Sequence, residues 1–224
     1  DPVLQQAEDF SDGTASVNDC FRPVSRYFDR ITRPEQIIPA LNRAMQVLTD
    51  PAECGPVTLS LCQDVQAEAY DYPESLFAER VWVPRQTRPD RRELAAAVAA
   101  LKGAKRPLVI AGGGVLYSQA SDELAKLAQG AGIPVCETQG GKSSLPDDHP
   151  LNMAAVGVTG TSAANRLAEE ADVVLAVGTR LQDFTTGSWA LFKNAGRTII
   201  GLNTQAFDAG KHWALPLVAD AAEG

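Results

Sequence analysis

Apolar runs recur along the second part of the chain, and polar segments separate them. The runs lie at 107–111 (PLVIA), 133–136 (IPVC), 172–177 (DVVLAV), 198–202 (TIIGL) and 215–219 (LPLVA). Because these residues do not alternate between apolar and polar, they are typical of strands buried on both faces of a parallel sheet. Two intervening segments, SDELAKLAQGAG and SAANRLAEEA, are amphipathic at helical spacing. Strands that alternate with helices predict a Rossmann-like α/β domain with helices on both faces of its sheet.

Residues 20–66 show a different arrangement, with one predicted helix and one predicted strand. Apolar residues recur at helical spacing from Ile37 to Leu48, after a stretch, 32–35, that has the form of a capping box. Pro39 conflicts with a helix that starts at this box, because its ring lacks a donor and clashes with the preceding turn. We therefore expect the helix to be kinked at Pro39 or to begin later. Residues 57–62 (VTLSLC) alternate strictly and predict a strand.

The chain is predicted to contain two units joined by a linker. Residues 67–89 carry three prolines, mixed charge and weak periodicity. A second capping-box pattern, DRRE at 90–93, predicts a helix that runs to about Lys102. The predicted organisation is a partial α/β unit over 1–66, a linker over 67–89 and the Rossmann-like domain over 90–224. Within the first unit, 1–19 are expected to form a loop, and the chain is expected to be a piece of a longer protein.

Composition narrows the class of partner. The 224 residues are 45% hydrophobic and 21% charged, with a formal net charge of −8. Nucleic acid and anionic membranes both attract clustered Lys and Arg, so neither is an expected partner. No apolar run approaches the length needed to span a bilayer. The four cysteines show no C-x-x-C spacing and the two histidines lie far apart, so no disulfide framework or metal site is predicted, and a reduced, cytoplasmic setting fits best.

Glycine- and hydroxyl-rich segments follow the predicted strands. They are 112–114 (GGG), 138–142 (TQGGK), 157–161 (GVTGT), 178–183 (GTRLQD) and 203–205 (NTQ). Ligands of open parallel sheets bind beyond the carboxyl ends of the strands, so these segments predict a crevice. The first segment fits only part of the dinucleotide fingerprint G-x-G-x-x-G, because Tyr117 stands at the third glycine, although Glu137 lies at a distance suited to a ribose hydroxyl. A tight strand-to-helix turn is therefore favoured over bound NAD.

Other motifs of phosphate-binding or catalytic loops are incomplete. Residues 141–143 (GKS) resemble the end of a P-loop, but Cys136 stands where its first glycine is required. Residues 160–164 lack the closing glycine of a nucleophile elbow, and the paired aspartates 147–148 favour a turn. Cys136, within an apolar strand, is most simply a buried thiol. The residues themselves predict no catalytic constellation.

Several segments, taken together and in order, resemble the superfamily of thiamine-diphosphate-dependent enzymes such as acetolactate synthase, pyruvate oxidase and glyoxylate carboligase. RPLVIAGGGVLYSQASDELAKLAQGAGIPVCET looks like the opening of their central domain, and HPLNMAAVGVTGTSAAN, EEADVVLAVGTRLQDFTTGSW and TIIGLNTQ follow in the family's order. Upstream, the segment from FRPVSRYFDRI to CGPVTLSLCQDVQ is similar to the closing third of their pyrimidine-binding domain. The resemblance covers about residues 20–220.

Within the superfamily, CGPVTLSLCQDVQAEAYDYPESLF, ETQGGKSSLPDDHPLN and GTRLQDFTTGS resemble the ring-opening hydrolases of myo-inositol breakdown. The resemblance implies a reaction in which the thiamine diphosphate ylide adds to one carbonyl of a trihydroxycyclohexane-1,2-dione. The adjacent C–C bond then breaks, and water releases an open-chain 5-deoxy-uronic acid. In the family an early Glu activates the cofactor, and a Gly-Asp-Gly…Asn motif binds magnesium and the diphosphate. Both are absent from this sequence, so no catalytic residue is carried over and the chain alone is expected to be inactive.

The resemblance also names candidate cofactor-binding residues. Some relatives hold FAD against the glycine turn and the G-T-R loop, and the matching positions here are Gly112, Gly113, Gly114, Arg180 and Asp183. The ring-opening branch does not need a flavin, so we expect an empty or remodelled crevice. The family places its cofactor between chains, which implies self-association to a dimer or tetramer. Two alternatives stay open: another carboligase or decarboxylase of the acetolactate synthase type, and a stand-alone module that binds FAD, NAD or ADP.

Overall fold

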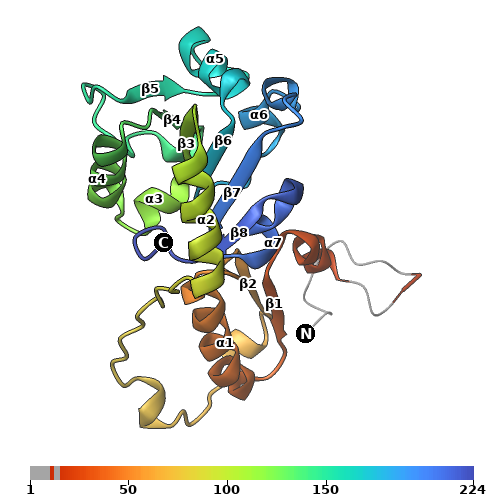
Figure 1. The fold of residues 1–224 in the computed structure, drawn as a ribbon. Helices are drawn as coiled ribbons and strands as arrows, with labels where there is room; N and C mark the ends of the chain where they lie inside the picture. Colours follow the sequence, from red (N-terminus) through yellow and green to blue (C-terminus); the bar gives the residue numbers. More distant parts are fainter. Residues whose placement is uncertain (1–10, 13–15) are drawn as a thin grey trace. The chain divides into compact units, whose positions relative to one another are not determined.

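A computed structural model describes residues 11, 12 and 16–224 of the chain, which divides into two compact units, Asp1–Arg85 and Gln86–Gly224 (Figure 1). The division falls within the stretch 67–89. The expected loop at 1–19 lies largely outside the described residues, and its last residues, 17–19, begin a 3-10 helix instead. Each unit is described by itself.

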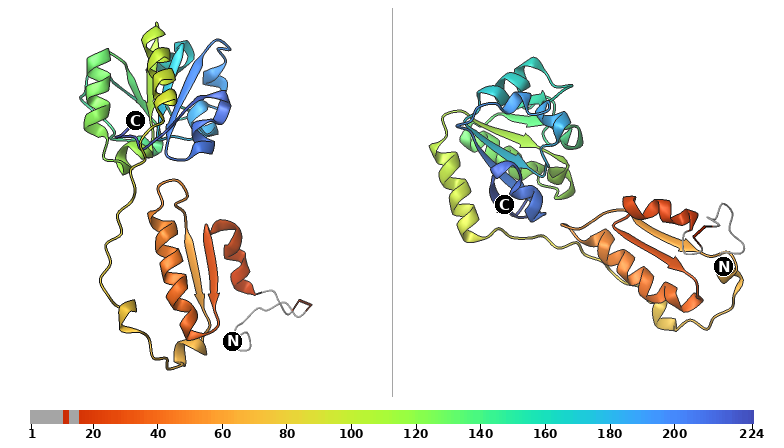
Figure 2. Two further views of the ribbon diagram at one scale, coloured as in Figure 1. Left: turned by 60° about the horizontal axis from the view of Figure 1, so that its bottom comes forward. Right: turned by 90° about the vertical axis from the view of Figure 1, so that its right-hand side faces the viewer.

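The first unit is built around two parallel strands (Figure 2). Its elements are the 3-10 helix η2 (Val17–Val24), β1 (Tyr27–Ile31), η3 (Pro34–Gln36), α1 (Ile37–Thr49), β2 (Val57–Leu61), η4 (Val65–Ala67) and η5 (Glu74–Leu76). Each residue of β1 pairs in parallel register with one of β2, from Tyr27–Val57 to Ile31–Leu61. One small core cluster holds the unit together, with Ile31, Ala40, Cys62 and Val65 buried in it.

The start of α1 corrects the predicted capping box. The side chain of Gln36, not Glu35, accepts hydrogen bonds from the amides of Thr32 (2.7 Å) and Arg33 (3.0 Å). Helix α1 then begins at Ile37, which leaves Pro39 within its first turn, where a missing amide is not needed by the helix. The prediction of a later start is therefore confirmed, and the strand predicted at 57–62 forms as β2.

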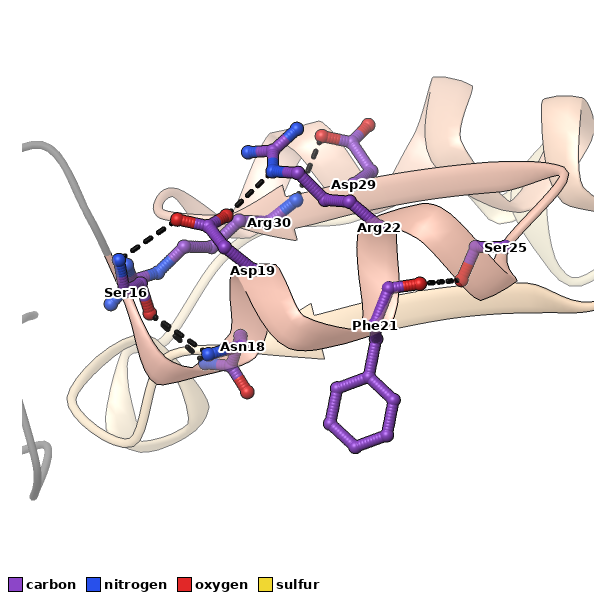
Figure 3. Close-up of polar contacts among 8 residues, drawn as sticks. All are labelled: Ser16, Asn18, Asp19, Phe21, Arg22, Ser25, Asp29 and Arg30. Carbon is purple, nitrogen blue, oxygen red and sulfur yellow. Dashed lines mark hydrogen bonds and ion pairs between the residues drawn. The ribbon is translucent and has the colours of Figure 1, made fainter.

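Polar contacts of η2 and β1 lie close together in the first unit (Figure 3). Ser16 caps η2 by accepting from the amide of Asn18, while Asp19 accepts from the Ser16 amide at 2.8 Å and pairs with Arg22 at 2.5 Å. The Ser16 amide, followed by Arg22, lowers the pKa of Asp19. Nε and Nη2 of Arg30 are buried without a hydrogen-bond partner among the described residues.

The second unit contains a six-stranded, fully parallel sheet in the order β5-β4-β3-β6-β7-β8. The strands are β3 (Pro107–Ala111), β4 (Val135–Glu137), β5 (Asn152–Ala155), β6 (Val173–Val177), β7 (Thr198–Asn203) and β8 (Leu215–Val218). The predicted α/β fold and all five predicted strands are confirmed. The sequence patterns did not reveal β5, which is an edge strand and lies partly exposed.

Helices cover both faces of this sheet. They are α2 (Arg91–Gly103), α3 (Gly113–Tyr117), α4 (Ser121–Ala131), α5 (Ser162–Glu170), α6 (Asp183–Thr186) and α7 (Ala206–Ala209), with the 3-10 turns η6 (Gln139–Gly141), η7 (Ala190–Phe192) and η8 (Lys211–Trp213). Successive residues of β3 point to opposite faces: Val109 joins a core with α2, α3 and α4, whereas Leu108 and Ile110 join one with α5 and η7.

The capping box predicted before α2 is half right. Asp90 caps the helix by accepting from the amides of Arg92 (2.7 Å) and Glu93 (3.4 Å). The carboxylate of Glu93 does not return to the cap. It accepts instead from the amide of Val218 at 2.8 Å, on the outer strand β8. Glu93 therefore satisfies an otherwise unpaired donor at the sheet edge.

Candidate functional site

The strand order places a topological switch point between β3 and β6. From β3 the chain moves outward to β4 and β5, and from β6 it moves outward in the other direction to β7 and β8. Because all strands are parallel, the glycine- and hydroxyl-rich segments that follow them lie at one edge of the sheet. This is the position at which open α/β sheets bind ligands. The candidate residues 112–114 follow β3, and 180–183 follow β6.

Glycine backbone fills the gap at this switch point. A β-carbon added to Gly114 would lie 2.5 Å from the Cα of Gly178, and one added to Gly112 would overlap the carbonyl oxygen of Gly178. Gly178 itself has φ +58°, in the left-handed region that favours glycine. The amide of Gly112 donates to Val177 O at 2.8 Å, and that of Gly114 donates to Gly178 O at 3.1 Å. The loop after β3 is therefore packed directly on the loop after β6.

The loop after β4 closes the other side of the glycine turn. A β-carbon on Gly113 would lie 3.1 Å from Gly140 O, and one on Gly141 would overlap Ala111 O. The hydroxyl of Thr138 holds this loop by accepting from the Gly141 amide at 3.1 Å. Glycines on three loops thus permit three backbone segments to touch.

The contacts of 112–114 bear on whether this loop binds a phosphate or only forms a tight turn. A phosphate cradle needs several free amides that point at one anion, whereas the amides of Gly112 and Gly114 both donate to carbonyl groups of the chain. The geometry supports the tight turn, and it leaves these two amides engaged within the chain. Tyr117, which replaces the third glycine of the fingerprint, is 90% exposed at the end of α3. Cofactor binding by Gly112, Gly113 and Gly114 stays a prediction.

Arg180 and Asp183 lie together in the exposed loop that follows β6, but no ion pair joins these two described residues. The Arg180 carbonyl accepts from Lys211 Nζ at 3.2 Å, and Asp183 occupies the first turn of α6. A small cavity of about 10 Å³ beside Arg180 has room for about one water molecule. Both charged side chains are free to meet a ligand from solvent, and their role in binding one also stays a prediction.

An aromatic cluster contacts the same loop, and the sequence patterns did not reveal it. The rings of Trp189 and His212 lie 4.2 Å apart, and His212 Nε2 is 3.3 Å from Leu181 O. Burial, followed by the neighbouring charge of Lys211, lowers the pKa of His212. A neutral imidazole suits this packing because a charged ring would be partly desolvated.

Glu137 and Cys136 end strand β4 inside the protein. Glu137 is buried, and its Oε1 accepts from the Leu145 amide at 3.1 Å, so its carboxylate braces the loop after β4 instead of facing a ribose site. Cys136 is fully buried, as predicted, and burial with the charge of Glu137 raises the pKa of its thiol to about 12. Such a thiol is inert as a nucleophile at neutral pH.

The described residues lack two features that would point to other kinds of function. They contain no cluster of three or more His, Cys, Asp or Glu side chains placed to hold a metal ion. Within residues 11, 12 and 16–224, none of the helices combines the length and apolarity required to traverse a bilayer.

Comparison with known families and proteins points to one group of enzymes. Residues 94–224 match the family described as "Thiamine pyrophosphate enzyme, central domain". The chain is 48% identical to 3D-(3,5/4)-trihydroxycyclohexane-1,2-dione hydrolase of Geobacillus thermodenitrificans over 224 residues. The alignment covers all of this chain and 35% of that protein. The protein of the same name from Bacillus thuringiensis is 48% identical over 223 residues and is likewise covered to 35%. The chain therefore spans about a third of the length of these relatives.

A solved structure shares the fold. It is an X-ray structure described as a putative thiamin diphosphate-dependent enzyme from Mycobacterium smegmatis, with a TM-score of 0.70 over 90% of this chain and 38% of that one. The sequence identity is 23%, so this likeness is evidence of the fold alone.

Proposed function

Because the chain belongs to the thiamine pyrophosphate enzymes and contains their central domain, we propose that it is part of a hydrolase that opens the ring of a trihydroxycyclohexane-1,2-dione. The observation that carries the proposal is the 48% identity to hydrolases of this name, which extends over both units of the chain. The product would be a 5-deoxy-uronic acid, formed within inositol catabolism.

The proposed role of this chain is to position other parts of the enzyme. When bound, thiamine pyrophosphate supplies the carbanion chemistry that cleaves a C–C bond next to a carbonyl. Among the described residues there is no group of three or more His, Cys, Asp or Glu side chains that could hold magnesium. The glycine contacts at the switch point instead make the sheet edge rigid, because backbone packed on backbone leaves little room for movement. We therefore expect catalysis to need the segments that the longer relatives possess.

The same proposal includes the setting and assembly of the enzyme. The four cysteines are free thiols, which fits a reducing, cytoplasmic environment. Self-association to a dimer or tetramer is expected, with magnesium as the companion of the cofactor and without FAD. Light scattering and metal and flavin analysis of the purified full-length protein test these points.

Turnover by the full-length protein is the direct test. With thiamine pyrophosphate and Mg²⁺, it should convert the cyclic dione to an open-chain uronic acid, and the 224-residue chain under the same conditions should not. Formation of acetolactate from pyruvate, without ring opening of the dione, would show that the full-length protein is a carboligase and not a hydrolase. Turnover by the 224-residue chain alone would contradict the positioning role.

A thermal shift assay of the 224-residue chain tests the alternative of a nucleotide-binding module. A ligand at a hundred times its Kd stabilises the folded state by about 2.7 kcal/mol. We expect no shift with FAD, NAD or ADP, because the amides of Gly112 and Gly114 are already bonded. A shift that Arg180→Ala abolishes would support the alternative.

A further inference from the structure

Backbone strain in the second unit is concentrated in two short segments. Eight of the described residues other than glycine have a positive φ, in the left-handed region that residues with a β-carbon rarely adopt. Five of the eight lie within 181–189 and 212–213. Residues in this region persist only where the surrounding contacts hold the backbone in place. The five are Leu181 (φ +44°), Ser188 (+52°), Trp189 (+70°), His212 (+59°) and Trp213 (+59°).

The two strained segments contact each other through His212. Its ring lies 4.2 Å from the ring of Trp189, and its Nε2 is 3.3 Å from Leu181 O, which accepts the hydrogen bond. The neighbouring Lys211 adds a second bond to the same loop, from its Nζ to Arg180 O at 3.2 Å. The turn that contains His212 therefore holds the start and the end of the loop that follows β6.

Trp189 provides a fixed support for this contact. Its ring stacks on that of Phe192 at 5.4 Å, and Phe192 is buried in the core cluster on the same face of the sheet. The guanidinium of Arg197 lies 4.7 Å from the centre of the Phe192 ring. The loop 180–188, in contrast, is exposed at five of its nine positions. His212 thus joins a support within the core to a loop at the surface.

This loop also holds its neighbours at the edge of the sheet. The Phe184 carbonyl accepts from the Val158 amide at 2.9 Å, and a β-carbon on Gly157 would overlap the same oxygen. Before the loop, Gly178 is fixed by its packing on 112–114. A movement that begins after Gly178 would therefore reach the segment that follows β5, because the two segments share a backbone hydrogen bond.

We propose that His212 is a positioning residue that latches the loop 180–188 in a strained conformation at the edge of the sheet. When the latch is released, the loop relaxes, and Arg180 and Asp183 change position together with the contact to Val158. The strain in the latched loop favours any ligand that binds the released loop, because binding then relieves the strain. The latch lies within the second unit and does not depend on which reaction the full-length protein catalyses.

Hydrogen–deuterium exchange of the full-length protein tests the latch without using catalytic turnover. His212→Asn and His212→Gly are two separate variants that remove the ring, and both asparagine and glycine tolerate the left-handed backbone at this position. Two variants keep the test valid if one of them folds poorly. Peptides that cover 180–189 and 156–162 report on the loop and its neighbour, and a peptide that covers β6 reports on the core.

Second-site variants distinguish a strained latch from ordinary packing. Ser188→Gly, added to each His212 variant, lets the backbone adopt φ +52° without strain. A loop without strain would gain only flexibility from this glycine and would exchange faster. Ser143→Gly is the matched control, because it is the same substitution at φ +72° in the exposed loop after β4.

Each His212 variant should raise the exchange rate of both loop peptides by about tenfold or more and leave the β6 peptide unchanged. Ser188→Gly should bring both rates back to within about threefold of the parent protein, and Ser143→Gly should not. Unchanged exchange at 180–189 in both variants would overturn the proposal. So would a failure of Ser188→Gly to restore protection, or rates at 156–162 that do not follow those at 180–189. Faster exchange that includes β6 in both variants would assign His212 to the core and would also overturn it.

Discussion

The two units differ in how completely each one buries its own strands. The first unit has a two-stranded sheet and one core cluster with four buried residues. The second unit has six strands and a core cluster on each face. A two-stranded sheet with one packed helix removes less apolar surface from water than a six-stranded sheet covered on both faces. The comparison predicts that the second unit is the more stable of the two.

The apolar surface of the first unit leads to the same conclusion. Phe21, Leu41, Leu48 and Leu61 are each more than 40% exposed. In the second unit every residue of β6 is buried, and the backbone contacts at the switch point are as close as glycine allows. The first unit thus exposes apolar side chains beside its one small core, whereas exposed apolar side chains of the second unit, such as Phe207 and Trp213, lie outside its two core clusters.

The largest effect on this contrast is expected from Gly178→Ala. The new methyl group would overlap the backbone of Gly114, and φ +58° disfavours any residue with a β-carbon. We expect the second unit to lose about 3–4 kcal/mol of unfolding free energy. Gly130→Ala is the control, because a β-carbon there has no neighbour within 4 Å and α4 should gain up to about 1 kcal/mol. Equal stability of the two variants in urea would show that the switch point is not tightly packed.

A smaller loss is expected from Arg197→Ala. The guanidinium donates to the carbonyls of Ala168 (2.6 Å), Glu169 (3.0 Å) and Ala171 (3.0 Å), and so it satisfies the carboxyl end of α5. Removing it should cost the second unit about 2 kcal/mol. Arg166→Ala removes an exposed pair with Glu170 on the same helix and should leave the urea midpoint close to that of the parent chain, because solvent screens such pairs. Urea denaturation of both variants, followed by circular dichroism, gives the difference.

Limited proteolysis compares the two units directly. Cleavage within residues 20–66 should be about tenfold or more faster than cleavage within 107–220. Local unfolding of the first unit exposes less buried surface and therefore costs less free energy. Mass spectrometry of the first fragments identifies the sites. Cleavage in the opposite order would overturn both the predicted domain boundaries and the contrast between the units.

Strands of the second unit were predictable because burial on both faces leaves an uninterrupted apolar run. β1 and β5 were not, since YFDRI carries two charges and NMAA is a short edge strand. Their formation depends on a neighbouring strand, which a local pattern does not report. For the same reason 112–114 and Gly178 were both predicted at the crevice, but their direct contact was not. That contact follows from β3 and β6 being neighbours in the sheet although β4 and β5 lie between them in sequence.

The smallest expected effect is on the stability of the second unit at low pH. It depends on one set of polar contacts and not on the apolar core. The carboxylate of Asp172, at the start of β6, accepts from the amides of Lys105 (2.8 Å) and Arg106 (2.9 Å), and these bonds lower its pKa. A folded-state pKa below the unfolded value contributes stability above the ordinary value of 3.8, and that contribution is lost as the pH falls through the folded-state pKa. Asp172→Asn should therefore lower the urea midpoint at about pH 6, and the difference from the parent chain should shrink as the pH falls below 3.8 and through the lowered pKa. Asp148→Asn, in an exposed loop, should keep the pH dependence of the parent chain. If Asp172→Asn also keeps it, the link between these residues contributes nothing to the stability of the unit.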